Sequence, residues 1–362
     1  MTRTFLGPDD VRELVGDVFG TDRRVTAMDR LSGGTKKGVY RLRLDDGTAS
    51  ILYVWASGEN YWPPSVNVPD DPFTDANDAE LFAVNHAALV AVGVPVPRLL
   101  FIDRAPSTAQ PRRPLAALHP RPGRNDRMDT AGGRYLNGDV ALVEDVGSVR
   151  LEELLNRADR PERSDADGAQ AATLAALGEA LRRMHTTYGP KYGRLADLAR
   201  GTASQARATE DVIVARALGH LDAAAGRDPR VAAARNRIAD HVHRLREAVR
   251  PRQQYALVHG ELGPDHVFVR SAGRPVLIDI EGLTYFDVEW EHAWLRMRFG
   301  DCYPALRPVN LDPDRLRLYR FAQILSLIEG PLRIADTDFP HRQWMLDLAE
   351  HNIGLALAAT ER

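Results

Sequence analysis

Two stretches of the sequence bring together side chains that can move protons and bind cations. In VHGELGPDHVFV, residues 258–269, acids and histidines stand between apolar residues typical of strand ends. Asp279 follows in VLIDIEG, after a turn signal at Ser271–Gly273. Carboxylates can orient and deprotonate a hydroxyl, or hold a hard cation such as Mg²⁺. The plain alternative is two ordinary strands joined by a polar turn, and the presence of both motifs at this spacing argues against it.

A second candidate site is the glycine-rich segment LSGGTKKGVY, residues 31–40. Gly33 and Gly34 lie between two strand-like runs, and glycine lets backbone N–H groups approach phosphate oxygens closely. Lys36 and Lys37 add compact positive charges suited to phosphate. The chain has 47 basic residues but only three lysines, two of them in this loop. The segment therefore suggests a phosphate site, although a plain hairpin with both lysines in solvent is the more common use of such a sequence.

Short strands and one long helix must position these two sites. Strand-like runs occur at residues 25–31, 39–44, 50–55 and 139–147. Helical spacing over residues 75–92 ends at Gly93. Residues 104–138 are rich in Pro, Arg and Gly and predict a long flexible loop. After Gly147 the pattern becomes mainly helical, so we expect a small β-rich lobe followed by a larger α-rich lobe.

Composition excludes several classes of protein. The chain has 362 residues and a formal net charge of −3, so no overall charge draws it to nucleic acid or to anionic membranes. The single cysteine, Cys302, excludes an intrachain disulfide and a multi-thiolate zinc site. The first residues lack the apolar run of a secretory signal, and no apolar stretch is long enough to span a bilayer. We expect a cytoplasmic globular protein.

The motifs at 258–291 resemble the aminoglycoside-phosphotransferase-like branch of the protein-kinase-like fold. That family carries His-Gly-Asp, then an Asn, then an Ile-Asp-Trp-Glu-type motif. Here His259-Gly260-Glu261 stands at the first motif, His266 at the Asn and IDIE, residues 278–281, at the last. The resemblance implies an α+β bilobal fold. Residues 1–147 would form the nucleotide-binding lobe, with an antiparallel sheet, a helix and a hinge, and residues 148–362 the mainly helical lobe with the catalytic loop and acceptor site.

The resemblance also implies roles within the catalytic loop. Glu261 would orient the attacking hydroxyl and accept its proton, and Asp279 would hold Mg²⁺ against the phosphates of ATP, with GTP also possible. His259 would brace the loop without reacting. Glu261 replaces the family's Asp, and His266 replaces the Asn that contacts metal. Because imidazole is a poor Mg²⁺ ligand, either one metal position is unfilled at His266 or Asp265 supplies the oxygen.

Other positions are assigned by the same resemblance. Backbone groups of Glu144 and Val146 would bind the adenine edge. Glu80 is the helix carboxylate expected to face the phosphate-binding lysine. Asp287 and Glu291 stand where the family has acids that brace the catalytic loop.

The third strand departs from the family most clearly. SILYVW, residues 50–55, has no lysine, and Tyr53 or Val54 stands near the family's lysine position. We hypothesise that Lys36 or Lys37 supplies the missing charge.

The expected activity is ATP-dependent phosphorylation of a hydroxyl on a small molecule, of which an antibiotic is the leading candidate. A sugar or metabolite kinase on the same fold is the first alternative. A pseudokinase that binds nucleotide without transfer is the second, supported by the three departures. We expect no nucleic-acid or membrane partner, and the oligomeric state and the acceptor stay open.

Overall fold

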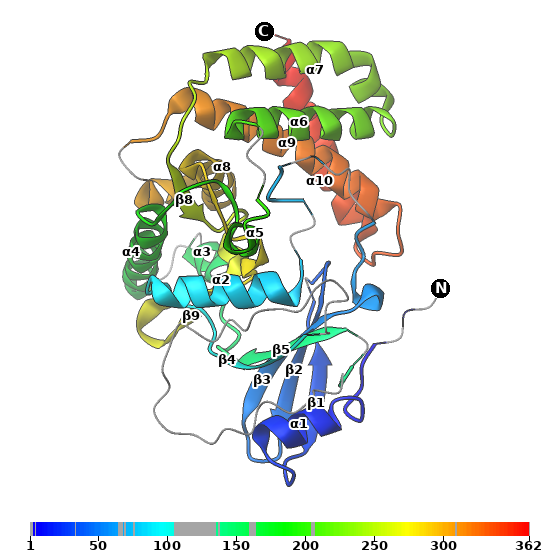
Figure 1. Cartoon of the computed structure of the whole chain (residues 1–362), viewed down its shortest axis with the longest axis vertical. Coiled ribbons are helices and arrows are strands. Elements are labelled where there is room, and N and C mark those ends of the chain that lie inside the picture. Colours follow the sequence, from blue (N-terminus) through cyan, green and yellow to red (C-terminus); the bar gives the residue numbers. More distant parts are fainter. Residues whose placement is uncertain are drawn as a thin grey trace. The chain divides into compact units, whose positions relative to one another are not determined.

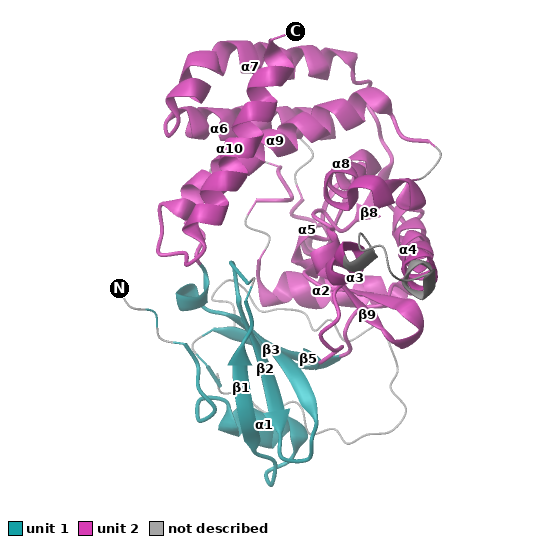
Figure 2. Ribbon diagram, turned by 180° about the vertical axis from the view of Figure 1, so that it is seen from behind, with its two compact units in different colours: residues 1–60, 99–144 teal, residues 61–98, 145–362 magenta. Residues whose placement is uncertain are grey.

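The computed structural model divides the described chain into two compact units (Figure 2). It describes residues 3, 5–32, 34–63, 68, 70–74, 77–104, 135–136, 138–158, 164–203, 207–307 and 310–361. Unit 1 comprises Met1–Asn60 and Leu99–Glu144, and unit 2 comprises Tyr61–Arg98 and Asp145–Arg362. Most of the loop expected at residues 104–138 lies outside the described residues.

The unit boundaries differ from the expected lobes in one segment. The junction at Glu144 lies close to the change of pattern expected at Gly147, but Tyr61–Arg98 groups with unit 2. This segment contains helix α2 (Ala79–Ala91), whose buried Asn85 donates hydrogen bonds to two backbone carbonyls of the Asp279 motif. Such contacts come from tertiary packing, which the pattern of helix and strand residues does not reveal.

Unit 1 is a five-stranded antiparallel sheet with a short helix (Figure 1). The strands are β1 (Val25–Arg30), β2 (Gly38–Leu44), β3 (Ala49–Trp55), β4 (Leu99–Asp103) and β5 (Asp139–Glu144), in the order β1-β2-β3-β5-β4. Helix α1 (Arg12–Phe19) and a 3₁₀ turn η1 (Ser57–Glu59) complete it. The strands predicted around the glycine-rich loop are confirmed.

The two faces of this sheet differ in what covers them. Helix α1 packs Leu14 and Val15 against Tyr40 and Leu42 of β2 and their neighbours. Because side chains alternate along a strand, the residues adjacent to them, Val39 and Arg41, belong to the opposite face.

Unit 2 is mainly helical and carries the catalytic-loop sequence on short strands. Its helices are α2, α3 (Leu151–Ala158), α4 (Ser164–His185), α5 (Leu195–Arg200), α6 (Thr209–Ala225), α7 (Pro229–Ala248), α8 (Val288–Phe299), α9 (Pro313–Ala335) and α10 (Arg342–Thr360). Its strands are β6 (Tyr188–Gly189), β7 (Gly193–Arg194), β8 (Tyr255–Val258), β9 (Val267–Arg270), β10 (Arg274–Leu277) and β11 (Thr284–Phe286). With unit 1, this confirms the α+β class.

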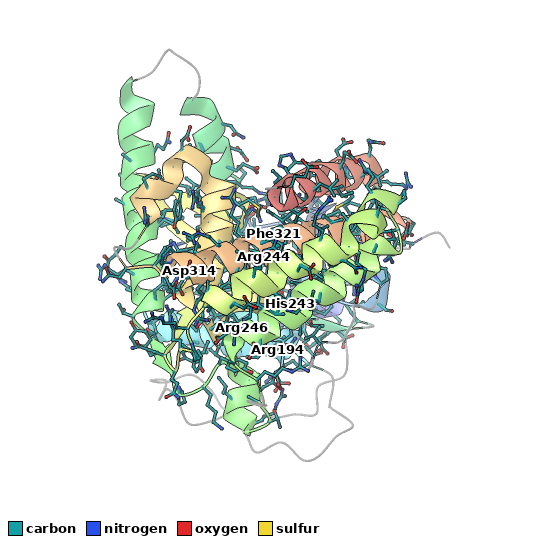
Figure 3. The ribbon with its side chains drawn as sticks, turned by 90° about the horizontal axis from the view of Figure 1, so that it is seen from above. Arg194, His243, Arg244, Arg246, Asp314 and Phe321 are labelled. Carbon is teal, nitrogen blue, oxygen red and sulfur yellow. The ribbon has the colours of Figure 1, made fainter. Side chains whose placement is uncertain are left out.

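Helices α6, α7, α9 and α10 build the larger core of unit 2 (Figures 1 and 3). Asp228 and Asp312 cap the amino ends of α7 and α9 by accepting backbone N–H bonds, and a proline follows each cap. Arg246 of α7, labelled in Figure 3, donates to Asp211 of α6 at 2.6 Å. Among the described helices, none has the length and apolar character needed to cross a membrane.

Candidate active site

The β9–β10 hairpin brings the two predicted motifs together. Its register pairs Val267 with Leu277, and the Ile278 amide donates to the His266 carbonyl at 3.0 Å. As a result, Nε2 of His266 lies 3.8 Å from Oδ2 of Asp279. Asp279 stands thirteen positions after His266 in the sequence, and the pairing of β9 with β10 brings these two residues close together.

Gly260 sets the path of the loop after β8. It has a φ of +96°, a conformation that side-chain-bearing residues rarely adopt, and a Cβ there would lie 2.8 Å from the Gly282 carbonyl oxygen. The Trp290 indole donates to the Gly260 carbonyl at 2.8 Å, and Phe73 stacks on that indole with ring centroids 4.5 Å apart. These contacts hold the backbone directly before Glu261.

Glu291 of α8 binds the backbone amides of the same loop. Its buried carboxylate accepts hydrogen bonds from the amides of His259, Gly260 and Leu262, the latter two at 3.3 and 3.4 Å. Burial raises the pKa of Glu291 to about 7, although the three amides act to lower it. The bracing role predicted for Glu291 is confirmed.

Asp287 does not share this role, contrary to the expectation. Its carboxylate accepts from Thr209 at 2.7 Å and contacts Arg315 and Tyr319. It precedes α8, so its side chain reaches α6 and α9 and ties those helices to the start of α8. Arg315, which also contacts Glu210 at 3.2 Å, is fully buried in this network.

His259 links the two motifs through its side chain. Its Nε2 donates to the Ile278 carbonyl at 2.9 Å, which fixes the neutral tautomer with the proton on Nε2. Burial lowers the pKa of His259 to about 4, with the charge of His266 as a further cause. The predicted bracing role for His259 is confirmed.

Glu261 is the exposed acid of the loop. The Nδ1 of His266 donates to its backbone carbonyl at 3.0 Å, which fixes the main chain at this residue. Among the described residues, none donates a hydrogen bond to the Glu261 carboxylate. A carboxylate held by its backbone and open to solvent is placed to meet an incoming hydroxyl.

Asp265, the alternative metal ligand, is engaged within the protein. Arg298 of α8 donates to its Oδ1 at 2.6 Å, and Nε2 of His266 lies 3.5 Å from its Oδ2. Burial acts to raise the pKa of Asp265, but the charges of His266 and Arg298 outweigh it and hold the pKa below the usual value. Gly263 makes room for this pair, since a Cβ there would lie 2.4 Å from the Arg298 guanidinium carbon.

Asp279 presents an exposed carboxylate next to the catalytic-loop sequence. Its side chain is 47% exposed, and its backbone has a φ of +57° at the turn before the 3₁₀ segment Ile280–Gly282. Among the described residues, no three His, Cys, Asp or Glu side chains gather as a metal-binding group. Mg²⁺ in nucleotide-dependent enzymes is commonly held by one or two carboxylates together with substrate phosphates and water. Asp279 could contribute one carboxylate to such a donor set, and the Asp265 carboxylate accepts a hydrogen bond from Arg298.

The remaining predicted residues lie on several elements. Gly33 falls outside the described residues, Gly34 and Lys36 are half-buried, and Lys37 is buried directly before β2. Glu144 ends β5 opposite Ser50, and Val146 follows it in the connection to α3. Glu80 of α2 forms an ion pair with Arg200 of α5 at 2.9 Å.

Sequence reasoning missed two positioning residues. Asn85 of α2 donates to the carbonyls of Ile280 and Glu281 at 2.8 and 3.0 Å, and Arg298 binds Asp265. The one available signal for Asn85 was a polar residue in the middle of a mainly apolar helix. Arg298 is one of many arginines in the chain and gave no signal.

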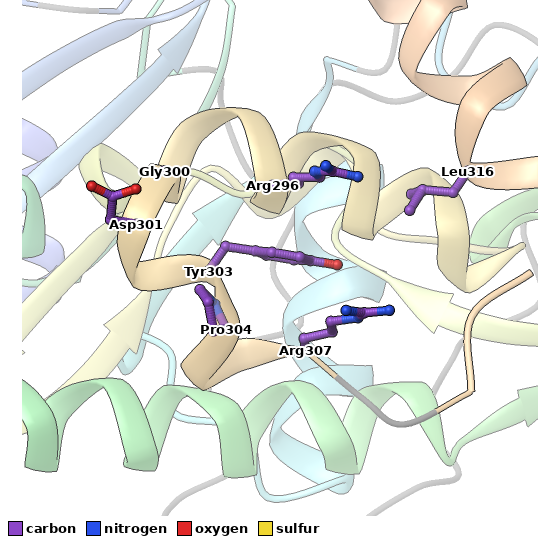
Figure 4. Close-up of a pocket in the computed structure, with 7 residues that line it drawn as sticks. All are labelled: Arg296, Gly300, Asp301, Tyr303, Pro304, Arg307 and Leu316. Carbon is purple, nitrogen blue, oxygen red and sulfur yellow. The ribbon is translucent and has the colours of Figure 1, made fainter. Parts of the chain in front are cut away.

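A separate cavity of about 420 Å³ lies beside α8 and the start of α9 (Figure 4). It is lined by Arg296, Gly300, Asp301, Tyr303, Pro304, Arg307 and Leu316. Arg296 and Arg298 are two positions apart on α8, about 200° around the helix, so the cavity opens away from the side that binds Asp265. It is not part of the catalytic-loop site.

Comparison with known proteins identifies a phosphotransferase family. Residues 68–322 match the model of a family described as the phosphotransferase enzyme family. Among curated protein sequences none matches the chain. The fold resembles a thermostable mutant of aminoglycoside phosphotransferase APH(4)-Ia in a ternary complex with AMP-PNP and hygromycin B, with 18% identity, a TM-score of 0.57, and coverage of 97% of this chain and 98% of that chain.

Two further solved structures share the fold. Spectinomycin phosphotransferase in complex with ADP and spectinomycin has 10% identity and a TM-score of 0.57, covering 99% of this chain and 100% of that chain. A Thermobifida fusca protein described as a fructosamine-3-kinase has 17% identity and a TM-score of 0.50, covering 97% and 100%. At these identities the likeness establishes the kinase-like fold.

Proposed function

The chain belongs to the phosphotransferase enzyme family and is a small-molecule kinase, and from that premise we propose that it transfers the terminal phosphoryl group of ATP to a hydroxyl of a small molecule. One observation carries the proposal. His266 lies between two exposed acids, Glu261 and Asp279. Its Nδ1 donates to the backbone carbonyl of Glu261, and its Nε2 lies 3.8 Å from Oδ2 of Asp279. A proton acceptor and a cation ligand thus belong to one braced loop.

Glu261 orients the acceptor hydroxyl and takes its proton as the new oxygen–phosphorus bond forms, while the bond to the nucleoside diphosphate breaks. Glu291, Trp290 and His266 hold the loop through its backbone groups. The Glu261 carboxylate takes no part in these bonds and can therefore bind the acceptor hydroxyl. Mg²⁺, when bound, neutralises charge on the phosphates, and Asp279 is the residue that would hold it. His266 stays with the loop backbone in this account, and Asp265 stays with Arg298.

In this proposal the glycine-rich loop and Glu144 of unit 1, together with Glu80 and Val146 of unit 2, supply the nucleotide-binding residues. The glycine-rich loop, with Gly33, Gly34, Lys36 and Lys37, binds phosphates through backbone N–H groups and ammonium charge. Backbone groups of Glu144 and, from the connection after β5, Val146 bind the adenine edge. Glu80 acts as the carboxylate partner of the phosphate-binding lysine, in addition to its pair with Arg200. ATP is the expected donor and GTP an alternative.

An antibiotic is the leading acceptor class. Two of the structural neighbours are antibiotic phosphotransferases crystallised with an antibiotic and a nucleotide, which supports this class. The likeness to a protein described as a fructosamine-3-kinase supports a sugar-type acceptor as the second candidate. A cytoplasmic location, where ATP is available, is part of the proposal. Incubating the protein with ATP, Mg²⁺ and each acceptor class, followed by mass spectrometry, separates the two candidates.

One observation supports the alternative that the protein is a pseudokinase. Asp265, which could have replaced the missing Asn as a metal ligand, is bound by Arg298, so the loop offers fewer oxygen ligands than the family pattern. Nucleotide binding that needs no Mg²⁺, without transfer to any acceptor, would identify this alternative. The retention of exposed carboxylates at Glu261 and Asp279 supports the enzyme instead.

A further inference from the structure

The cavity beside α8 contains two arginines whose charges the described residues leave uncompensated. Arg296 lies in the last turn of α8, and Arg307 directly follows the 3₁₀ segment Gly300–Leu306. Within the described part of the chain, neither guanidinium group forms a hydrogen bond or an ion pair. The lining contains one acid, Asp301, and it is paired with neither arginine. The cavity therefore has an excess of positive charge.

Other arginines of the same helices are paired with acids. Arg298 of α8 donates to Asp265 at 2.6 Å. Arg315 of α9 contacts Glu210 at 3.2 Å. A guanidinium group in such a pair has already used part of its donor capacity, whereas the two cavity arginines keep their N–H donors for a ligand.

Tyr303 places a hydroxyl group between the two cavity arginines. Its side chain is buried, with 7% exposed, and it lines the cavity. Figure 4 shows the guanidinium groups of Arg296 and Arg307 on either side of this hydroxyl, while Asp301 lies at the other end of the cavity. Burial raises the pKa of Tyr303, and the charges of both arginines act to lower it, so both charges lie near the phenol oxygen. Three hydrogen-bond donors thus converge on one region.

His292 determines where the Tyr303 hydroxyl can donate. Its Nδ1 lies 3.4 Å from the Tyr303 oxygen, and its buried Nε2 has no hydrogen-bond partner among the described residues. Burial lowers the pKa of His292 to about 2, so the ring is neutral and carries one proton. A proton on Nε2 would be a buried donor without an acceptor, which favours the tautomer protonated on Nδ1. In that tautomer His292 donates to the Tyr303 oxygen, and the hydroxyl proton is left for the cavity.

The rest of the lining suits an organic group. The ring of Tyr303, together with Pro304 and Leu316, gives the cavity an apolar surface next to its charged end. Its volume of about 420 Å³ falls within the range of about 300–1,000 Å³ that is usual for small-molecule sites. The site therefore has room for an anionic head group and a small apolar body.

We propose that this cavity binds a small organic phosphate monoester, with Arg296, Arg307 and the Tyr303 hydroxyl donating to its phosphate oxygens. Two guanidinium charges match the dianion that a phosphate monoester forms above its second pKa of about 6. The planar guanidinium group also binds phosphate oxygens in a bidentate manner. The cavity is a second binding site, apart from the catalytic loop, and this inference does not depend on the proposed function.

The test measures binding of phenyl phosphate to the full chain by calorimetry, at about pH 7.5, where the dianion predominates. The native chain should bind phenyl phosphate more tightly than inorganic phosphate, which lacks the apolar body. It should also bind phenyl phosphate more tightly than benzoate, which has a single charge.

Arginine variants assign the binding to this cavity. Arg296→Gln and Arg307→Gln should each weaken binding by about tenfold or more, the loss expected for a hydrogen bond to a charged group. Arg244→Gln is the matched control and replaces an exposed arginine of α7 labelled in Figure 3. It should change binding by less than about twofold, because an exposed distant charge is screened. Both cavity arginines are exposed, so their variants should keep the native melting temperature.

Tyr303→Phe tests the hydroxyl while it keeps the ring. It should weaken binding of phenyl phosphate by about threefold to tenfold, because one neutral donor is lost. If Tyr303→Phe does not fold, the two arginine variants still decide.

Three results would overturn the proposal. The first is a native chain that does not bind phenyl phosphate at millimolar concentration. The second is unchanged affinity in the folded double variant Arg296→Gln with Arg307→Gln, because the probe would then occupy another site. The third is binding of benzoate as tight as that of phenyl phosphate, which would assign the cavity to carboxylates.

Discussion

The Nδ1 of His266 donates to the backbone carbonyl of Glu261 at 3.0 Å, so the residue that replaces the family's metal-contacting Asn supports the residue that replaces its catalytic Asp. The two departures are therefore neighbours in one arrangement. His266 fixes the backbone from which the longer glutamate side chain extends. This relationship gives a structural reason for both substitutions to occur in the same loop.

Glu261 should be essential for transfer and not for nucleotide binding. Glu261→Ala should lower kcat by about 10²- to 10⁴-fold, the usual contribution of a positioned general base, with the Kd for AMP-PNP little changed. Glu261→Asp should retain part of the rate because the braced backbone stays in place. Glu247→Ala, which removes an exposed glutamate of α7, is the matched control. Full activity in Glu261→Ala would remove this residue from the mechanism.

His266 should act through the position of the loop. His266→Ala removes the donor to the Glu261 carbonyl, so kcat should fall by about tenfold while the KM for ATP changes less. His266→Asn, which keeps an N–H donor, should retain more activity than His266→Ala. Steady-state kinetics of the two variants are sufficient, and equal rates in His266→Ala and the native chain would contradict the role.

The two nearby aspartates should differ in their effect on metal dependence. Asp279→Asn should raise the Mg²⁺ concentration for half-maximal activity by at least about tenfold, because it removes the exposed oxygen charge. Asp265→Asn should leave that concentration nearly unchanged but lower the melting temperature, since it weakens the pair with Arg298. A Mg²⁺ titration of both variants decides, and an equal shift in both would show that Asp265 is also a ligand.

Stability should fall in mild acid because burial holds several histidines in their neutral form, and three of them have strongly lowered pKa values. Burial lowers the pKa of His185 and His259 to about 4 and that of His292 to about 2, against an ordinary 6.5. As the pH falls, the unfolded chain binds protons at these histidines before the folded chain does. The stabilising contribution of the neutral histidines is therefore complete above pH 6.5 and is lost as the pH falls toward 4. Glu291, whose pKa burial raises to about 7, contributes in the opposite direction between pH 4.5 and 7.

Urea unfolding at two pH values isolates the histidine effect. In His292→Leu the loss of unfolding free energy between about pH 6.5 and about pH 5 should be smaller than in the native chain. His243→Leu, which replaces an exposed histidine of α7 labelled in Figure 3, should leave that loss unchanged. An identical pH dependence in His292→Leu and the native chain would count against the buried neutral histidine.

The sequence was sufficient to predict the fold class and the two motifs, because strand alternation and motif spacing are local properties. It also placed His259 and Glu291 as braces, through the family resemblance. It could not predict that Arg298 binds Asp265, or that Asn85 of α2 binds the Asp279 motif, because both contacts join segments far apart in the sequence. Asp287 was wrongly expected to brace the loop, since the sequence does not show that its side chain reaches Arg315.

The central claim is that Glu261 and Asp279 support phosphoryl transfer to a small-molecule hydroxyl. The most direct test incubates the protein with ATP, Mg²⁺ and a panel of antibiotics and sugars and records product masses. We predict that at least one acceptor gains the mass of one phosphoryl group, and that both Glu261→Ala and Asp279→Ala abolish the gain. Tight nucleotide binding with no phosphorylated acceptor in the panel, or a product that persists in both variants, would contradict the account.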